Sequence, residues 1–150
     1  SKTYSMAGWR IGFALGNRRI ISSLLRVKQV VDSGVPWAIQ YAGIRALSGP
    51  ERAVEELRRT YQERRDILVD GLRCLGWKVE SPKATFYIWA PILSGSSTLE
   101  FAKSLLKETG ILVVPGIGFG AYGEGYVRFS LTLDKELIEK ALPRLKSIGV

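Results

Sequence analysis

The chain has 150 residues, of which 46% are hydrophobic and 24% charged, and this composition is that of a globular chain with a buried core and excludes a disordered one. It contains no His and a single Cys, Cys74, so an internal disulfide, the common zinc sites and the nucleophile arrangements that need His are excluded. The net charge of +8 favours anionic partners, but the basic residues are spread along the chain with little clustering, so no nucleic-acid partner is expected.

The first predicted element is a β-strand over residues 9–15. Apolar side chains occupy every second position there, which is typical of a half-buried strand. Arg10 shares the opposite face with Gly12 and Ala14. These small neighbours leave room beside a fixed positive charge, as a phosphate site needs. The pattern fits equally well a surface arginine without a ligand, next to a glycine that is needed for close packing.

Three helices are predicted next. Asn17 is a suitable N-cap for a helix that breaks at Gly34 and Pro36, and a second helix covers residues 37–47. Pro50 suits the first turn of a long amphipathic helix that extends to Gly76. About 25 residues in this helix span roughly 38 Å, a length that could join two domains.

The remaining part is predicted to alternate strands and helices, which indicates an α/β fold. The predicted elements are strands at residues 77–80 and 85–90, a helix capped by Thr98 that runs through Lys107 and stops at Gly110, strands at 111–114 and 126–131, and a last helix capped by Asp134 and bent or shortened by Pro143.

Five glycines crowd residues 116–125, between two of the predicted strands. Gly118 to Gly123 formally match the dinucleotide fingerprint G-x-G-x-x-G. In a dinucleotide site this motif is followed by a helix, whereas here a predicted strand follows it. A tight loop that lets the backbone approach a ligand or a neighbouring chain is therefore favoured over dinucleotide binding.

Arg128 is the clearest candidate for a ligand contact in the second half of the chain. It shares one face of its predicted strand with Tyr126 and Ser130, opposite the apolar Val127 and Phe129. A guanidinium is well shaped to hold a carboxylate through two parallel hydrogen bonds. A solvent-exposed strand arginine would give the same pattern.

The opening segment Ser1-Lys2-Thr3-Tyr4-Ser5-Met6-Ala7-Gly8-Trp9-Arg10-Ile11-Gly12 resembles the lysine segment of the class I/II aminotransferases. These are pyridoxal-phosphate enzymes of fold type I, in which S-K followed by G-x-R-x-G marks the cofactor lysine and a phosphate-binding arginine. Later segments agree in the right order: Gly34-Val35-Pro36, Ala84-Thr85-Phe86-Tyr87-Ile88-Trp89, Pro115-Gly116 with Phe119-Gly120, and Arg128-Phe129-Ser130. The resemblance spans all 150 residues but covers only the C-terminal part of a usual family chain.

The resemblance implies roles for three residues. Lys2 matches the lysine that forms a Schiff base with pyridoxal 5'-phosphate and later moves a proton at the substrate Cα. Arg10 matches the arginine that pairs with the cofactor phosphate, and Arg128 matches the one that clamps the substrate α-carboxylate. The implied reaction transfers an amino group from an amino acid to a 2-oxo acid. Within the family the chain is similar to prokaryotic LL-diaminopimelate, aspartate and alanine aminotransferases, and the sequence does not choose among them.

The resemblance also implies a domain organisation. Residues 1–49 would end the large cofactor domain, residues 50–75 would form the linking helix, and residues 76–150 would form the small C-terminal domain. The chain opens without Met, and the family's ligands to the cofactor ring lie upstream of the lysine. We therefore expect a fragment that binds the cofactor poorly, does not turn over and self-associates through exposed apolar side chains, whereas its parent is a homodimer.

Other functions remain open at this point. An aminotransferase-like effector domain of a pyridoxal-phosphate-dependent transcription regulator would keep the same lysine, and a carbon-sulfur lyase would keep the same fold. A basic nucleic-acid-binding module is a third alternative. No apolar run approaches the roughly 20 residues that a membrane-spanning helix needs, so we expect no membrane contact. The single cysteine fits a reducing compartment, and we expect a cytoplasmic protein.

Overall fold

The computed structural model describes residues 1–93 and 95–148, which divide into two compact units. The first unit is residues 1–56 and the second begins at Leu57. Each unit is described by itself. Within the described residues, no helix is long and apolar enough to cross a membrane.

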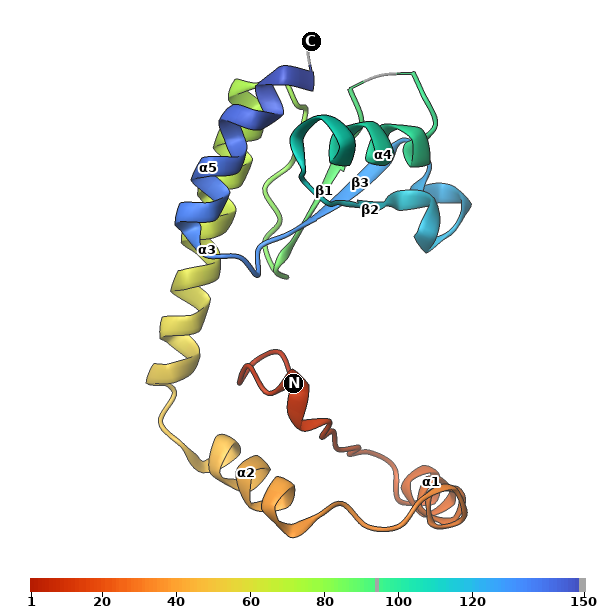
Figure 1. The fold of residues 1–150 in the computed structure, drawn as a ribbon. Helices are drawn as coiled ribbons and strands as arrows, with labels where there is room; N and C mark the ends of the chain where they lie inside the picture. Colours follow the sequence, from red (N-terminus) through yellow and green to blue (C-terminus); the bar gives the residue numbers. More distant parts are fainter. Residues whose placement is uncertain (94, 149–150) are drawn as a thin grey trace. The chain divides into compact units, whose positions relative to one another are not determined.

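The first unit is built from helices and a short 3-10 turn (Figure 1). Its elements are the turn Ala7–Trp9, α1 (Arg18–Val31), α2 (Trp37–Ser48) and the beginning of α3 (Arg52–Cys74). All three helices were predicted, and the cap of α1 is confirmed because the Asn17 side chain accepts a hydrogen bond of 2.9 Å from the backbone N–H of Arg19. Pro50 lies just before α3 and outside its first turn.

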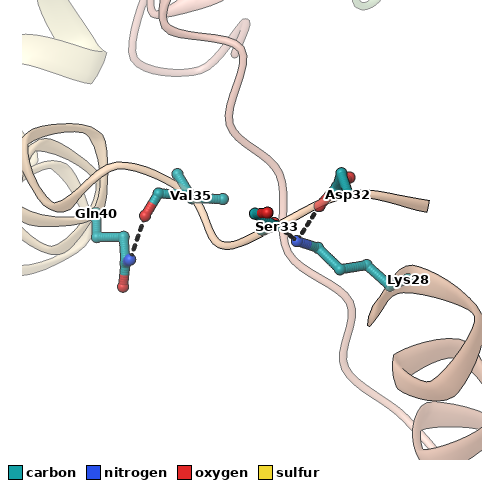
Figure 2. A network of polar contacts seen from close by, with 5 residues as sticks. All are labelled: Lys28, Asp32, Ser33, Val35 and Gln40. Atoms are coloured by element: carbon teal, nitrogen blue, oxygen red, sulfur yellow. Dashed lines mark hydrogen bonds and ion pairs between the residues drawn. The ribbon is translucent and has the colours of Figure 1, made fainter. Parts of the chain in front are cut away.

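The segment between α1 and α2 is tied to both helices by side chains (Figure 2). The Lys28 ammonium, in the last turn of α1, donates to the carboxylate of Asp32 and to the carbonyl of Ser33. The Gln40 side-chain amide, in the first turn of α2, donates to the carbonyl of Val35 at 2.6 Å. These contacts satisfy backbone and side-chain groups locally and set the path of the chain between the two helices.

None of the described side chains of residues 1–56 is buried. Phe13, Leu15 and Val30 are 73%, 86% and 89% exposed. Most helical stability in proteins comes from packing an apolar face, and α1 has such a face without a partner inside its unit. The expected self-association stays a prediction, and this surface supplies its physical reason.

The predicted strand over residues 9–15 is wrong. Trp9 ends the 3-10 turn, Arg10 adopts a left-handed conformation with φ of 51°, and no strand follows. Alternating apolar residues mark one side of an extended segment, but a strand also needs a neighbour for its backbone hydrogen bonds. The described part of the chain provides no such neighbour.

The second unit contains a three-stranded antiparallel sheet with the order β1-β3-β2. Its strands are β1 (Tyr87–Pro91), β2 (Val114–Pro115) and β3 (Tyr126–Ser130), and its further helices are α4 (Thr98–Thr109) and α5 (Lys135–Leu145). In the central strand β3, Arg128 lies opposite Trp89 of β1 and Val114 of β2. The predicted alternation of β3 is confirmed, since Val127 and Phe129 are buried while Arg128 belongs to the other face.

One face of this sheet forms the core of the second unit. Ile88, Ala90, Val127 and Phe129 project from it into a cluster with buried residues of α3, α4 and α5. The helical members are Leu68, Val69, Leu72, Phe101, Ala102, Leu105, Ile138 and Leu145. Burial of this apolar surface, at roughly 25 cal/mol per Å², is the main stabilising term of the unit. The three helices therefore cover the same face, and the other face is left free for a site.

Two other predicted strands differ in the structure. Residues 77–80 form no strand, although Trp77 and Val79 are buried in the core, and the predicted strand 111–114 is reduced to β2. Apolar residues at these positions reflect burial and not strand pairing.

The helix caps of the second unit are partly as predicted. The N-cap of α4 is Ser97, which forms a capping box with Glu100, and Thr98 is already the first helical residue. Gly110 ends α4 in the left-handed conformation with φ of 67°, as predicted. Asp134 precedes α5, but its carboxylate accepts a hydrogen bond from Arg64 and caps no backbone N–H. Pro143 lies inside α5.

The glycine-rich loop, residues 116–125, connects β2 to β3 and folds closely upon itself. A Cβ atom on Gly116 would lie 2.1 Å from the carbonyl oxygen of Gly123, and one on Gly123 would lie 2.0 Å from that of Gly116. Only glycine permits this crossing. The tight loop is as predicted, but the close approach is between two parts of the loop itself, whereas the sequence predicted an approach to a ligand or a neighbouring chain.

We expect Gly116→Ala to lower the free energy of unfolding by about 1–3 kcal/mol, because the added methyl group must displace backbone atoms. Urea unfolding followed by tryptophan fluorescence measures the change. Gly118→Ala is the matched control, since a Cβ there meets nothing within 4 Å. Equal unfolding midpoints for the two variants would contradict the importance of the crossing.

Candidate functional site

The first eleven residues form a hydrogen-bonded turn that presents Lys2. The backbone N–H of Met6 donates to the carbonyl of Ser1 at 2.8 Å, and that of Ser5 donates to the carbonyl of Lys2 at 3.2 Å. The Ser1 hydroxyl donates to the carbonyl of Ile11 at 3.4 Å. The Lys2 side chain is exposed, and its ammonium has no hydrogen-bond or ion-pair partner within the described residues.

Arg10 is held at the end of the same turn in an unusual backbone conformation. Its φ of 51° and ψ of 46° are in the left-handed region, which costs a residue with a side chain roughly 1–2 kcal/mol. Its Nη1 donates to the carbonyl of Ala7 at 3.0 Å. Positions beside it are open, because a Cβ on Gly8 or Gly12 would meet no atom within 4 Å. Strain of this kind often occurs at functional sites.

Lys2 and Arg10 together offer two cationic groups of different chemistry on one short segment. A lysine amine can bond covalently to an aldehyde, and a guanidinium pairs with a phosphate through several parallel hydrogen bonds. This donor set, with open space around Gly8 and Gly12, fits an aldehyde that carries a phosphate group.

Arg128 belongs to the second unit and lines a cleft of about 820 Å³ on the free face of the sheet. Its guanidinium carbon lies 4.0 Å from the centre of the Tyr87 ring and 4.6 Å from that of the Phe119 ring. Trp89 and Tyr126 also line the cleft and stack on each other at 5.6 Å. Aromatic rings therefore lie against Arg128 within the cleft, which Lys78, Glu80 and Lys83 also line.

Arg128 differs from the other half-buried arginines, Arg64 and Arg65, in having no counterion. Arg64 pairs with Asp134 at 2.6 Å, and Arg65 pairs with Asp66 at 2.7 Å. Across the described residues, no hydrogen bond or ion pair reaches the Arg128 guanidinium. A partly buried charge without a partner is costly, so the position favours a ligand that brings a negative charge.

A hydrogen-bonded link fixes the end of the glycine-rich loop. The backbone N–H of Thr98 donates to the Glu124 carboxylate at 2.7 Å, and the Thr98 hydroxyl accepts from the backbone N–H of Gly125 at 2.7 Å. The carbonyl of Gly125 in turn accepts from the N–H of Ile92 at 2.9 Å. The loop is thereby attached to the N-terminus of α4 and to the end of β1.

The structure divides the three predicted site residues between the two units. Lys2 and Arg10 share the opening turn of the first unit, whereas Arg128 is central in the sheet of the second. Sequence reasoning assigned no role to the aromatic residues around Arg128. For Tyr87 and Trp89 a signal existed, because they alternate with the buried Ile88 and Ala90.

No metal site accompanies these residues. Among residues 1–93 and 95–148, no three His, Cys, Asp or Glu side chains form a group that could hold a metal ion.

We expect Thr98→Val to lower the free energy of unfolding by about 1–3 kcal/mol, because it leaves the Gly125 N–H without its acceptor. Urea unfolding measures the effect. Thr132→Val, which removes an exposed hydroxyl, serves as the control and should change stability by no more than about 0.5 kcal/mol. A loss equal to that of the control would show that the link contributes little.

Comparisons with known proteins relate the whole chain to one family. The family model described as aminotransferase class I and II matches residues 1–145. The LL-diaminopimelate aminotransferase of Moorella thermoacetica is 50% identical over 148 residues, which is 99% of this chain and 38% of that protein. The LL-diaminopimelate aminotransferase of Halothermothrix orenii is 52% identical over 150 residues, which is 100% of this chain and 39% of that protein.

Solved structures agree with this relationship. The aromatic aminotransferase of Pyrococcus horikoshii superimposes with a TM-score of 0.94 at 36% identity, covering 99% of this chain and 40% of that one. A double mutant of the Thermus thermophilus aspartate aminotransferase gives a TM-score of 0.92 at 32% identity, covering 99% and 39%. The chain thus spans about two fifths of the length of the relatives that it matches.

Proposed function

The chain belongs to the class I and II aminotransferase family, and on that premise we propose that it is part of an enzyme that transfers an amino group from an amino acid to a 2-oxo acid. The structural observation that carries this proposal is the unpaired guanidinium of Arg128 in the cleft of the second unit. Every amino acid and 2-oxo acid substrate carries a carboxylate next to the reacting carbon. Arg128 is the group that binds this carboxylate and orients the substrate.

Lys2 and Arg10 are the residues that hold the family's cofactor, pyridoxal 5'-phosphate, in this proposal. The Lys2 amine would hold the cofactor through its aldehyde, and the Arg10 guanidinium would pair with its phosphate. When bound, the cofactor supplies an electron sink for negative charge at the substrate Cα. With the substrate in place of Lys2 on the cofactor, the free Lys2 amine would hold and move the proton at the substrate Cα. The exposed, unpartnered ammonium of Lys2 is compatible with both tasks.

The proposal extends to the organisation of the parent enzyme. Residues 1–49 are the end of its large cofactor domain, residues 50–75 its linking helix, and residues 76–150 its small domain. The long helix α3, which passes from the first unit into the second, supports this division. We place the parent in the cytoplasm as a homodimer. LL-diaminopimelate is the first donor to test, because two relatives at 50% and 52% identity bear that name.

Titration of the 150-residue chain with pyridoxal 5'-phosphate, followed by visible absorbance, tests the assignment of Lys2 and Arg10. We expect weak saturable binding that Lys2→Ala abolishes, because the covalent bond is lost. Arg10→Ala should weaken binding about tenfold to a hundredfold, which corresponds to the loss of charged hydrogen bonds.

Two further variants serve as controls for adventitious adducts. Lys103→Ala and Arg26→Ala remove exposed cations from α4 and α1, and binding should be unchanged in both. A saturable absorbance band that persists in Lys2→Ala would sink the proposed role of this lysine.

A further inference from the structure

Two aromatic rings from separate segments contact the Arg128 guanidinium. Tyr87 is the first residue of β1 and lies opposite Ser130, two residue pairs along the sheet from Arg128. Phe119 comes from the glycine-rich loop. Their ring centres are 4.0 Å and 4.6 Å from the guanidinium carbon, well inside the roughly 6 Å at which a cation and a ring attract each other.

The glycine-rich loop fixes the position of Phe119. The crossing of Gly116 and Gly123 closes the loop, and the N–H of Gly120 donates to the carbonyl of Ile117 at 3.0 Å. The Phe119 ring also meets Trp89 edge-on at 5.6 Å. This ring is therefore supported from the loop and from β1, although 54% of the residue remains exposed.

Rings against a guanidinium restrict both its orientation and the directions from which a ligand can approach. The guanidinium is planar, and a ring over its face leaves the in-plane N–H groups as donors. A carboxylate bound by two parallel hydrogen bonds lies in that plane. A free arginine side chain has about 2 kcal/mol of rotamer entropy to lose, so a pre-oriented one binds more tightly.

We propose that Tyr87 and Phe119 are positioning residues, which hold the Arg128 guanidinium in the orientation that receives the α-carboxylate of the substrate. This inference rests on the carboxylate-binding role given to Arg128 above. It also assigns a purpose to the glycine-rich loop, whose close crossing places Phe119 against the cation.

The test is an NMR titration of the ¹⁵N-labelled 150-residue chain with acetate at constant ionic strength, observed at the Arg128 Nε–Hε signal. In the wild-type chain the Hε signal should be shifted upfield by the two rings, and hydrogen bonding to acetate should move it downfield in a saturable way. Tyr87→Leu and Phe119→Leu should each reduce the ring-induced shift and weaken acetate binding about two- to fivefold.

Conservative and matched variants separate positioning from a loss of folding. Tyr87→Phe and Phe119→Tyr keep a ring and should retain both the shift and the affinity. Tyr41→Leu removes an exposed aromatic residue of α2 that does not line the cleft, and it should leave the Arg128 signal unchanged. Unaltered amide signals of the buried Leu72 and Leu105 show in each variant that the core is intact.

The two possible failures are distinguishable. If acetate leaves the Arg128 signal of the wild-type chain unchanged, the carboxylate-binding role of Arg128 fails, and the inference fails with it. If wild-type Arg128 responds to acetate and both leucine variants respond with the same affinity, only the positioning role of Tyr87 and Phe119 is overturned.

Discussion

Packing of three helices against a single face of a small antiparallel sheet determines what the second unit can do. The inward side chains of β1 and β3 join α3, α4 and α5 in one apolar core, so the other face of the same strands remains open. Because strand side chains alternate, the residue between Val127 and Phe129 must point away from this core. Arg128 occupies that position, and its placement follows from the burial of its two neighbours.

The two units achieve order by different means. In the second unit, buried apolar side chains from five elements fix the structure. In the first, the described side chains are all at least partly exposed, and order comes from helix caps, turn hydrogen bonds and the contacts of Lys28 and Gln40. Lys2 and Arg10, which are assigned to the cofactor, therefore lie in the unit that is ordered by local hydrogen bonds. Arg128, which is assigned to the substrate, lies in the unit that is ordered by a buried core.

Local signals made most of the helices predictable, because caps and apolar periodicity act within a few residues. Asn17 and Gly110 are examples of such signals. Strand pairing joins distant segments, so residues 9–15 and 77–80 were mistaken for strands although their apolar patterns are real. The alternation in β3 did predict the face of Arg128. Lys2 was found only through the family resemblance, and the contact of Phe119 depends on a loop crossing that no pattern in the sequence predicts.

The central place of β3 in its sheet also bears on how the chain fluctuates. Its neighbours β1 and β2 bond to it from both sides, so the backbone amides around Arg128 can exchange with solvent hydrogen only when much of the second unit unfolds. Lys2 and Arg10 lie where local opening exposes no buried core and therefore costs little free energy. A ligand that binds these two residues must supply the ordering free energy of its own site, whereas one that binds Arg128 meets a backbone already held in place.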